Sequence, residues 1–220
     1  MYKYKLISKR PTIDSPKRRK IILESENECE EEKINDELIT YKDNHIYFYD
    51  DINTKNILQL IKFIKEINIK LLTLKAEMDY KYNTSTNFYI YLHINSCGGY
   101  ITDALAGIDY IKQSQIPIIS IIDGHAASAA TFLSVVCHKR QITSSSSMLI
   151  HQLSSGTCGT FQQIDDDHIN NKYLQDKIKQ IYIDHSNGKL TDKSLDKILK
   201  HDIMWDAKKC KQNGIVDEII

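Results

Sequence analysis

The chain has 220 residues, of which 41% are hydrophobic and 26% are charged, and its 29 Lys and Arg equal its 29 Asp and Glu. This composition excludes a mostly disordered chain, and the 8 Gly and 3 Pro exclude collagen-like and linker-rich proteins. A net charge of zero disfavours nucleic-acid binding, which needs a basic face, and no apolar run reaches the roughly 18 residues of a membrane span.

Two blocks of opposite charge open the chain. Residues 1–20 carry eight Lys or Arg and one Asp, and residues 24–37 carry seven Glu, one Asp and one Lys. Blocks of like charge that are poor in core-forming residues usually stay solvated. We therefore predict that residues 1–43 form a flexible charged extension, with a docking arm as the alternative, and that residues 44–220 form one folded domain.

The cysteines and the first residues bear on the cellular compartment. Five cysteines, none of them in a Cys-x-x-Cys pair, indicate reduced thiols rather than a disulfide framework or a compact zinc site. The basic start lacks the apolar stretch of a signal peptide. We expect a protein of the cytoplasm, or of an organelle matrix such as that of a plastid.

From His45 onward, strand and helix patterns alternate. Residues 46–49 read as a short strand, and the apolar stripe of residues 54–67 predicts a helix with Thr54 as its N-cap. Residues 70–86 are ambiguous and end in a polar surface loop. Residues 88–94 carry the strongest strand signal and run into two glycines.

The second half of the chain continues the alternation. Apolar runs and turn residues predict strands at 118–122, 141–143, 148–150 and 215–216, and helices at 102–112, 128–137, 161–185, 192–200 and 207–213. Asp206 is the expected N-cap of the last helix. Unbroken isoleucine runs suit buried parallel strands, so we predict an α/β fold.

A serine at a strand-to-helix junction is the first candidate for chemistry. Gly124 makes a turn after a buried strand, and Ser128 then begins a helix of small residues. Such a serine is usually only an N-cap. The functional alternative is a nucleophile exposed by the elbow, with the helix dipole favouring developing negative charge.

Two further segments have weak signals of their own. Gly98 and Gly99 follow a strand, where glycines can present backbone N–H groups to an oxyanion or simply form a tight turn. His151 follows the apolar strand 148–150, from which its side chain can reach a site at the edge of the sheet. Taken singly, each is more often structural.

Together, these segments resemble the Clp protease proteolytic subunit family in order and spacing. The family pattern is a strand into S-P-G-G, then G-x-A-A-S-M-G-A, then M-I-H-Q. The matching segments here are Asn95-Ser-Cys-Gly-Gly99, Gly124-His-Ala-Ala-Ser-Ala-Ala130 and Met148-Leu-Ile-His-Gln152. The closing segment Trp205 to Asp217 is also similar, so the resemblance covers residues 45–218.

The resemblance implies a fold, a reaction and a set of site residues. The fold is the Clp/crotonase type, a superhelix of β-β-α units with a projecting long helix. Ser128 matches the nucleophile, His151 the general base and Asp202 the acid that orients it. The implied oxyanion donors are the N–H groups of Gly98 and Ala129. Substrate is expected to lie extended against Gly99, Leu153 and Ser154, pairing with an edge strand near residues 153–159.

Several positions depart from the family pattern. Cys97 and Leu153 replace prolines, and Ala129-Ala130 replaces Met-Gly. His201 replaces an arginine that helps to join two rings in the family. Residues 71–86 look like an insertion.

The predicted function is that of an endopeptidase that cleaves unfolded polypeptides inside an oligomeric ring, a heptamer or stacked rings. By resemblance its partner is an AAA+ ATPase unfoldase, and no metal, cofactor, nucleic acid or membrane is expected. Three alternatives stay open: a non-catalytic ring subunit of the same fold, a viral or phage maturation protease, and a crotonase-type acyl-CoA enzyme.

Overall fold

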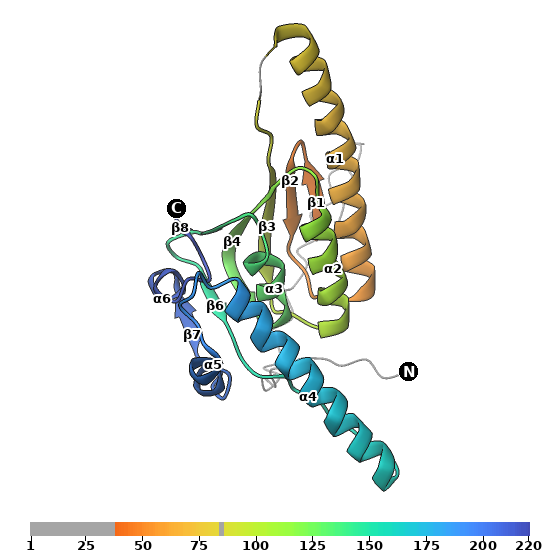
Figure 1. Cartoon of the computed structure of the whole chain (residues 1–220), viewed down its shortest axis with the longest axis vertical. Coiled ribbons are helices and arrows are strands. Elements are labelled where there is room, and N and C mark those ends of the chain that lie inside the picture. The colour runs from red at the N-terminus through yellow and green to blue at the C-terminus, as the bar shows by residue number, and fades with distance from the viewer. Residues whose placement is uncertain (1–37, 84–85) are drawn as a thin grey trace, which may run out of the picture.

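The computed structural model describes residues 38–83 and 86–220. The charged blocks of the predicted extension, residues 1–37, lie outside the described residues. Within the described part, eight strands form one sheet in the order β1-β2-β3-β4-β5-β8, with β6 paired to β4 and β7 paired to β6 (Figure 1).

Strands and helices alternate along the chain, as predicted. The strands are β1 (Ile39–Lys42), β2 (His45–Phe48), β3 (Ile90–Ser96), β4 (Ile118–Ala127), β5 (Lys139–Ile142), β6 (Ser147–Leu149), β7 (Met204–Asp206) and β8 (Glu218–Ile219). The helices are α1 (Thr54–Tyr82), α2 (Ile101–Gln113), α3 (Ala129–Val135), α4 (Phe161–Asp184), α5 (Asp192–Ile198) and α6 (Ala207–Gln212).

The central strands are parallel, and β4 joins two parts of the sheet. Its first half pairs with β5, whereas its last residues, His125 to Ala127, pair with β6. Strands β3, β4 and β6 therefore run side by side in one direction, and their carboxyl ends lie near one another. The segments that follow these three strands are the ones that carry the candidate glycines, serine and histidine.

Helix α2 packs between α1 and α3, α1 and α3 also contact the sheet, and α4 projects from the body of the molecule (Figure 1). Inward-facing isoleucines and leucines of β2 and β3 alternate with side chains on the other face, as the period of a strand requires. Leu174, Ile178 and Ile181 anchor α4 through one buried face, as its spacing predicts. The predicted α/β class is confirmed.

Helix α1 differs from the prediction at both ends. Its N-cap is Asn53, not Thr54, because the Asn53 side chain accepts a hydrogen bond from the Asn56 N–H at 2.9 Å. The helix also continues through most of the ambiguous segment to Tyr82, where Leu, Lys, Ala, Glu and Met favour helix. Asn83 then ends it in a left-handed conformation.

Several strand boundaries also differ. Residues 39–42, the end of the predicted extension, form β1 because they pair with β2. The short β7 was not predicted, since it owes its form to pairing with β6. The last strand lies at Glu218–Ile219 instead of 215–216, because Ile215 and Val216 turn into the core before the chain reaches β5.

The described residues contain neither a membrane-spanning helix nor a metal-binding cluster. No helix among them combines the length and apolarity needed to cross a membrane. No three of their His, Cys, Asp or Glu side chains are grouped as a metal ion would require. The four cysteines among them are free thiols, and burial raises the pKa of Cys137 to about 12.

Candidate active site

Ser128 forms a strained elbow between β4 and α3. Its φ of 56° and ψ of −128° place a non-glycine residue in a sparsely populated region, at a cost of about 1–3 kcal/mol. The residue occupies the N-cap position, but its side chain makes no capping hydrogen bond. Its Oγ is buried and has no hydrogen-bond partner among the described residues. Capping therefore does not account for this hydroxyl.

Hydrogen bonds from two other elements hold the elbow in place. The Ser128 N–H donates to the carbonyl oxygen of Leu149, at the end of β6, at 2.8 Å. The Thr131 hydroxyl donates to the Ser128 carbonyl oxygen at 2.6 Å, and the fully buried Tyr182 of α4 bonds the same Thr131 oxygen at 2.6 Å. The strained conformation is thus fixed by β6 and, through Thr131, by α4.

The predicted oxyanion donors lie against this elbow. Gly98 has a φ of 92°, and a Cβ there would lie 2.8 Å from the Ser128 Cβ and 3.1 Å from the Ala129 nitrogen, so only glycine fits. The Ala129 N–H has no intrahelical acceptor, because Ala129 is the first residue of α3. The Gly98 N–H donates to the Ser96 Oγ at 3.1 Å. A substrate oxygen bound there would have to take the place of that hydroxyl.

The neighbouring glycine is held by a segment that the sequence analysis missed. A Cβ on Gly99 would overlap the carbonyl group of Ile52. The Ile52 N–H donates to the Gly98 carbonyl oxygen at 2.8 Å, and the Tyr100 N–H donates to the Ile52 carbonyl oxygen at 2.9 Å. Ile52, which follows β2, therefore holds the glycine pair in place through these two hydrogen bonds. Position 99 must be glycine because any side chain there would prevent this close approach.

His151 and Asp202 are brought together as the resemblance implies. The His151 Nδ1 lies 3.1 Å from the Asp202 Oδ1, and the imidazole is 5% exposed whereas the carboxylate is 64% exposed. Burial lowers the pKa of His151, and the charge and hydrogen bond of Asp202 oppose that effect without cancelling it. The imidazole is therefore neutral at neutral pH, with its Nδ1–H directed to Asp202 and its Nε2 lone pair available to accept a proton.

The hydroxyl of Ser128 and the free nitrogen of His151 share one property. Both the Ser128 Oγ and the His151 Nε2 are buried and lack a hydrogen-bond partner among the described residues. Leu149, which binds the Ser128 N–H, stands two positions before His151. Buried polar atoms are normally paired, so this hydroxyl oxygen and this ring nitrogen are exceptions of the kind found at reactive sites. In many enzymes without bound substrate, the hydrogen bond between such a hydroxyl and a histidine nitrogen is long or absent, and it forms only when substrate binds.

The predicted substrate segment is not a strand. Residues 150–159 lack regular structure, so the expected edge strand near residues 153–159 is wrong. The Leu153 N–H donates to the Gln175 Oε1 of α4 at 2.8 Å, and the Gln152 N–H donates to the Leu199 carbonyl oxygen at 2.8 Å. These donors are taken by α4 and α5 rather than by a neighbouring strand. Leu153 and Ser154 are half-buried beside His151.

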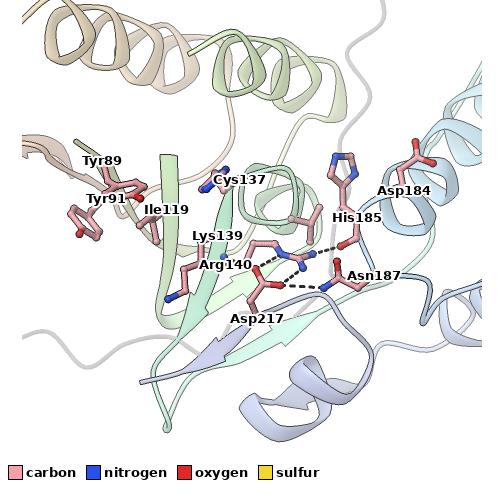
Figure 2. A pocket seen from close by; sticks show the side chains of 12 residues that line it. Tyr89, Tyr91, Ile119, Cys137, Lys139, Arg140, Asp184, His185, Asn187 and Asp217 are labelled. Atoms are coloured by element: carbon pink, nitrogen blue, oxygen red, sulfur yellow. Dashed lines mark hydrogen bonds and ion pairs between the residues drawn. The ribbon is translucent and has the colours of Figure 1, made fainter. Parts of the chain in front are cut away.

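Two of the cavities in the described part of the chain border α4. One, of about 380 Å³, begins at Gln152 and Leu153 and runs between α4 and α5. The other, of about 580 Å³, lies beside β5 and the end of α4 (Figure 2). Two charged side chains that line this second cavity are paired with each other, because the Arg140 Nε donates to the Asp217 carboxylate at 2.9 Å. Arg140 also donates to the His185 carbonyl oxygen. Neither cavity is lined by Ser128 or His151.

The burial of His151 predicts the acid side of a pH–rate profile. If the neutral imidazole is the base, kcat/KM for a short peptide should reach half its plateau below pH 6.5, the ordinary pKa of histidine. A series of initial rates from about pH 5 to pH 8 measures this midpoint. A midpoint above pH 6.5 would mean that the charge of Asp202 affects the pKa of His151 more strongly than burial does.

Comparisons with known proteins agree on one family. The sequence model of the Clp protease family matches residues 30–220. The chain is 33% identical over 177 residues to the ATP-dependent Clp protease proteolytic subunit 2 of Prochlorococcus marinus subsp. pastoris, which covers 77% of this chain and 86% of that protein. It is 34% identical over 133 residues to the ATP-dependent Clp protease proteolytic subunit of Streptococcus mutans, covering 60% of this chain and 68% of that protein.

Proposed function

The chain belongs to the Clp protease family, and on this premise we propose that it is a serine endopeptidase with Ser128, His151 and Asp202 as its catalytic residues. The α/β sheet with its projecting α4 fits the Clp/crotonase-type fold predicted from the motifs. The observation that carries the proposal is the buried, unpartnered Ser128 hydroxyl on a strained elbow, whose N–H is bonded to Leu149, two positions before a buried histidine paired with Asp202.

The proposed reaction assigns one task to each group. The Ser128 Oγ attacks the peptide carbonyl carbon while the His151 Nε2 accepts the hydroxyl proton. Asp202 stabilises the resulting imidazolium through Nδ1–H. His151 then gives its proton to the leaving amine, and water hydrolyses the acyl-enzyme by the same steps.

The charge that develops on the carbonyl oxygen is assigned to two backbone donors. Gly98 lies against both Ser128 and the Ala129 nitrogen, and the N–H groups of Gly98 and Ala129 are the proposed oxyanion hole. Such donors contribute about 2.7–4 kcal/mol each to the stability of the transition state. Because the Gly98 N–H donates to the Ser96 hydroxyl without substrate, binding would exchange one hydrogen bond for a stronger one to a charged oxygen.

The proposed setting is a ring-shaped chamber served by an ATPase. The two relatives are named as proteolytic subunits of ATP-dependent proteases, and we extend that arrangement to this chain. Helix α4 exposes large apolar side chains that a second subunit would cover: Phe161, Ile164, Ile169 and Tyr173. The proposed compartment is the cytoplasm or an organelle matrix such as that of a plastid.

If the active site lies inside a closed chamber, the protein should cleave unfolded substrates and spare folded ones. The purified chain should sediment as a species of several subunits and should cleave short peptides, yet it should spare a folded reporter. Unfolding a folded domain costs about 5–15 kcal/mol, and an enclosed site admits only extended chain. An unfolded, permanently denatured version of the reporter is the control and should be cleaved. Rapid digestion of the folded reporter by the chain alone would contradict the chamber.

A further inference from the structure

A polar network crosses three strands on the sheet face that lies away from α1. The His45 Nδ1 lies 3.0 Å from the His93 Nε2, and the His93 Nδ1 lies 2.6 Å from the Asp123 Oδ2. The Tyr49 hydroxyl donates to the same carboxylate oxygen at 2.8 Å. His45 stands on β2, His93 on β3 and Asp123 on β4, so one chain of hydrogen bonds links three neighbouring strands.

The hydrogen-bond partners determine where the protons are. An ionised Asp123 only accepts, so His93 donates to it from Nδ1. In the neutral ring, the His93 Nε2 is then an acceptor, and His45 must donate to it from its own Nδ1. One added proton preserves this contact: on the His45 Nε2 it leaves the direction unchanged, and on the His93 Nε2 it reverses the direction once His45 holds its own proton on Nε2. A second added proton places N–H groups on both facing nitrogens, and the hydrogen bond is lost.

The three linked strands hold the glycine and serine segments of the proposed site. Strand β3 continues into Gly98, and β4 continues through Gly124 into Ser128. Strand β2 continues into Ile52, which is hydrogen-bonded to the glycine segment. Loss of the bond between His45 and His93 would remove a side-chain link between β2 and β3 and leave only their backbone pairing and the Ile52 hydrogen bonds to hold the two strands together. The Gly98 N–H, which these strands position beside the elbow, would then be held less firmly.

We infer that His45, His93 and Asp123 form a proton-sensitive positioning network that aligns the oxyanion glycine with Ser128 and releases it in acid. The inference rests on the proposed function, since it assigns a role in the alignment of that site. None of the three residues touches the substrate; they act through β2, β3 and Ile52. The bistable element is the contact between His45 and His93, which exists with one or no added proton and is broken by two.

The surroundings of the network support this behaviour. Burial and the charge of His93 lower the pKa of His45, while Asp43 in the preceding turn opposes them. Protonation of His45 therefore needs more acid than that of an ordinary histidine, and it belongs to the doubly protonated state in which the contact is lost. The other titratable groups that face the network are Tyr47, Tyr49 and Tyr91, with Lys139 of β5 beside Tyr91.

The test compares how steeply acid slows the reaction of Ser128 with a fluorophosphonate probe. The wild-type rate should fall by more than about tenfold per pH unit, because acid protonates His151 and also breaks the contact between His45 and His93. His45→Asn keeps the contact at every pH, since an amide can either donate to His93 or accept from it. Its rate should match the wild type within about twofold at pH 7.5 and fall about tenfold per unit in acid.

A matched control removes a histidine outside the network. His138 lies immediately before β5, where its ring stacks on Tyr89. His138→Asn should keep the steep wild-type profile. Equal steepness in the wild type and His45→Asn would overturn the inference. Complete absence of labelling at every pH in all three proteins would instead overturn the proposed function.

A second measurement does not depend on reactivity. In Ser128→Ala protein, nitrogen-15 spectra of the imidazoles should show His45 and His93 both protonated at Nδ1 near neutral pH. The two rings should titrate in coupled steps, with the first proton shared between them. Independent titration of the two rings, or an Nε2–H tautomer of His93 near neutral pH, would contradict the network even if Ser128 is the nucleophile.

Discussion

Ser128→Ala is expected to reduce the hydrolysis of a short peptide by about a millionfold, the scale seen when a serine-protease nucleophile is removed. The hydroxyl is the attacking atom in the proposed reaction, and no other serine of the described residues combines a buried, unpartnered Oγ with a strained backbone. Initial rates with a fluorogenic peptide measure the loss.

The matched control for this substitution is Ser134→Ala in the same helix. The Ser134 hydroxyl is also buried, but it is hydrogen-bonded to the Ser120 Oγ at 2.9 Å. Its removal should lower the free energy of unfolding by about 1 kcal/mol and leave the peptide rate nearly unchanged. A Ser128→Ala protein that keeps its rate would remove Ser128 from the reaction.

Asp202→Asn is expected to reduce the same rate by about three to four orders of magnitude. The amide can donate to the His151 Nδ1 and so favour the wrong tautomer, and it cannot stabilise the imidazolium. Because the Asp202 carboxylate is largely exposed, water screens part of its charge, and the loss should lie at the lower end of this range. Assays of kcat for the folded variant measure it.

Asp206→Asn is the control for this second substitution. Asp206 caps α6 by accepting the Lys209 N–H at 2.7 Å, and asparagine caps a helix equally well. This variant should therefore keep both its fold and its peptide rate. If Asp206→Asn lost activity while Asp202→Asn kept it, the orienting role would belong to Asp206.

Local patterns predicted the elements that position the site. The long apolar runs predicted β3 and the first half of β4, although β4 continues through Gly124, the expected turn, to Ala127, and the parallel ends of the two strands bring Gly98 and Ser128 together. The helix α4 was predicted to within one residue, because its buried positions recur with helical spacing. The roles of Ser128, His151 and Asp202 came from the family resemblance, since each signal is weak when taken alone.

The features that sequence did not predict are contacts between distant segments. Ile52 reaches the glycine pair only because β2 pairs with β3, and Tyr182 reaches Thr131 only because α4 crosses α3. The network of His45, His93 and Asp123 joins residues that are 48 and 30 positions apart. No local period or motif encodes such contacts, so they emerge only when the sheet is assembled.

Covalent labelling of Ser128 is the most direct test of the proposed reaction. A fluorophosphonate probe reacts with serines activated by a neighbouring base, and mass spectrometry of the digested protein locates the adduct. The adduct should form on Ser128 in the wild type, at a strongly reduced rate in His151→Ala, and not at all in Ser128→Ala. An assembled, folded wild-type protein without any adduct would contradict the proposed catalytic site and favour a non-catalytic ring subunit, and an adduct on a different serine would place the nucleophile elsewhere.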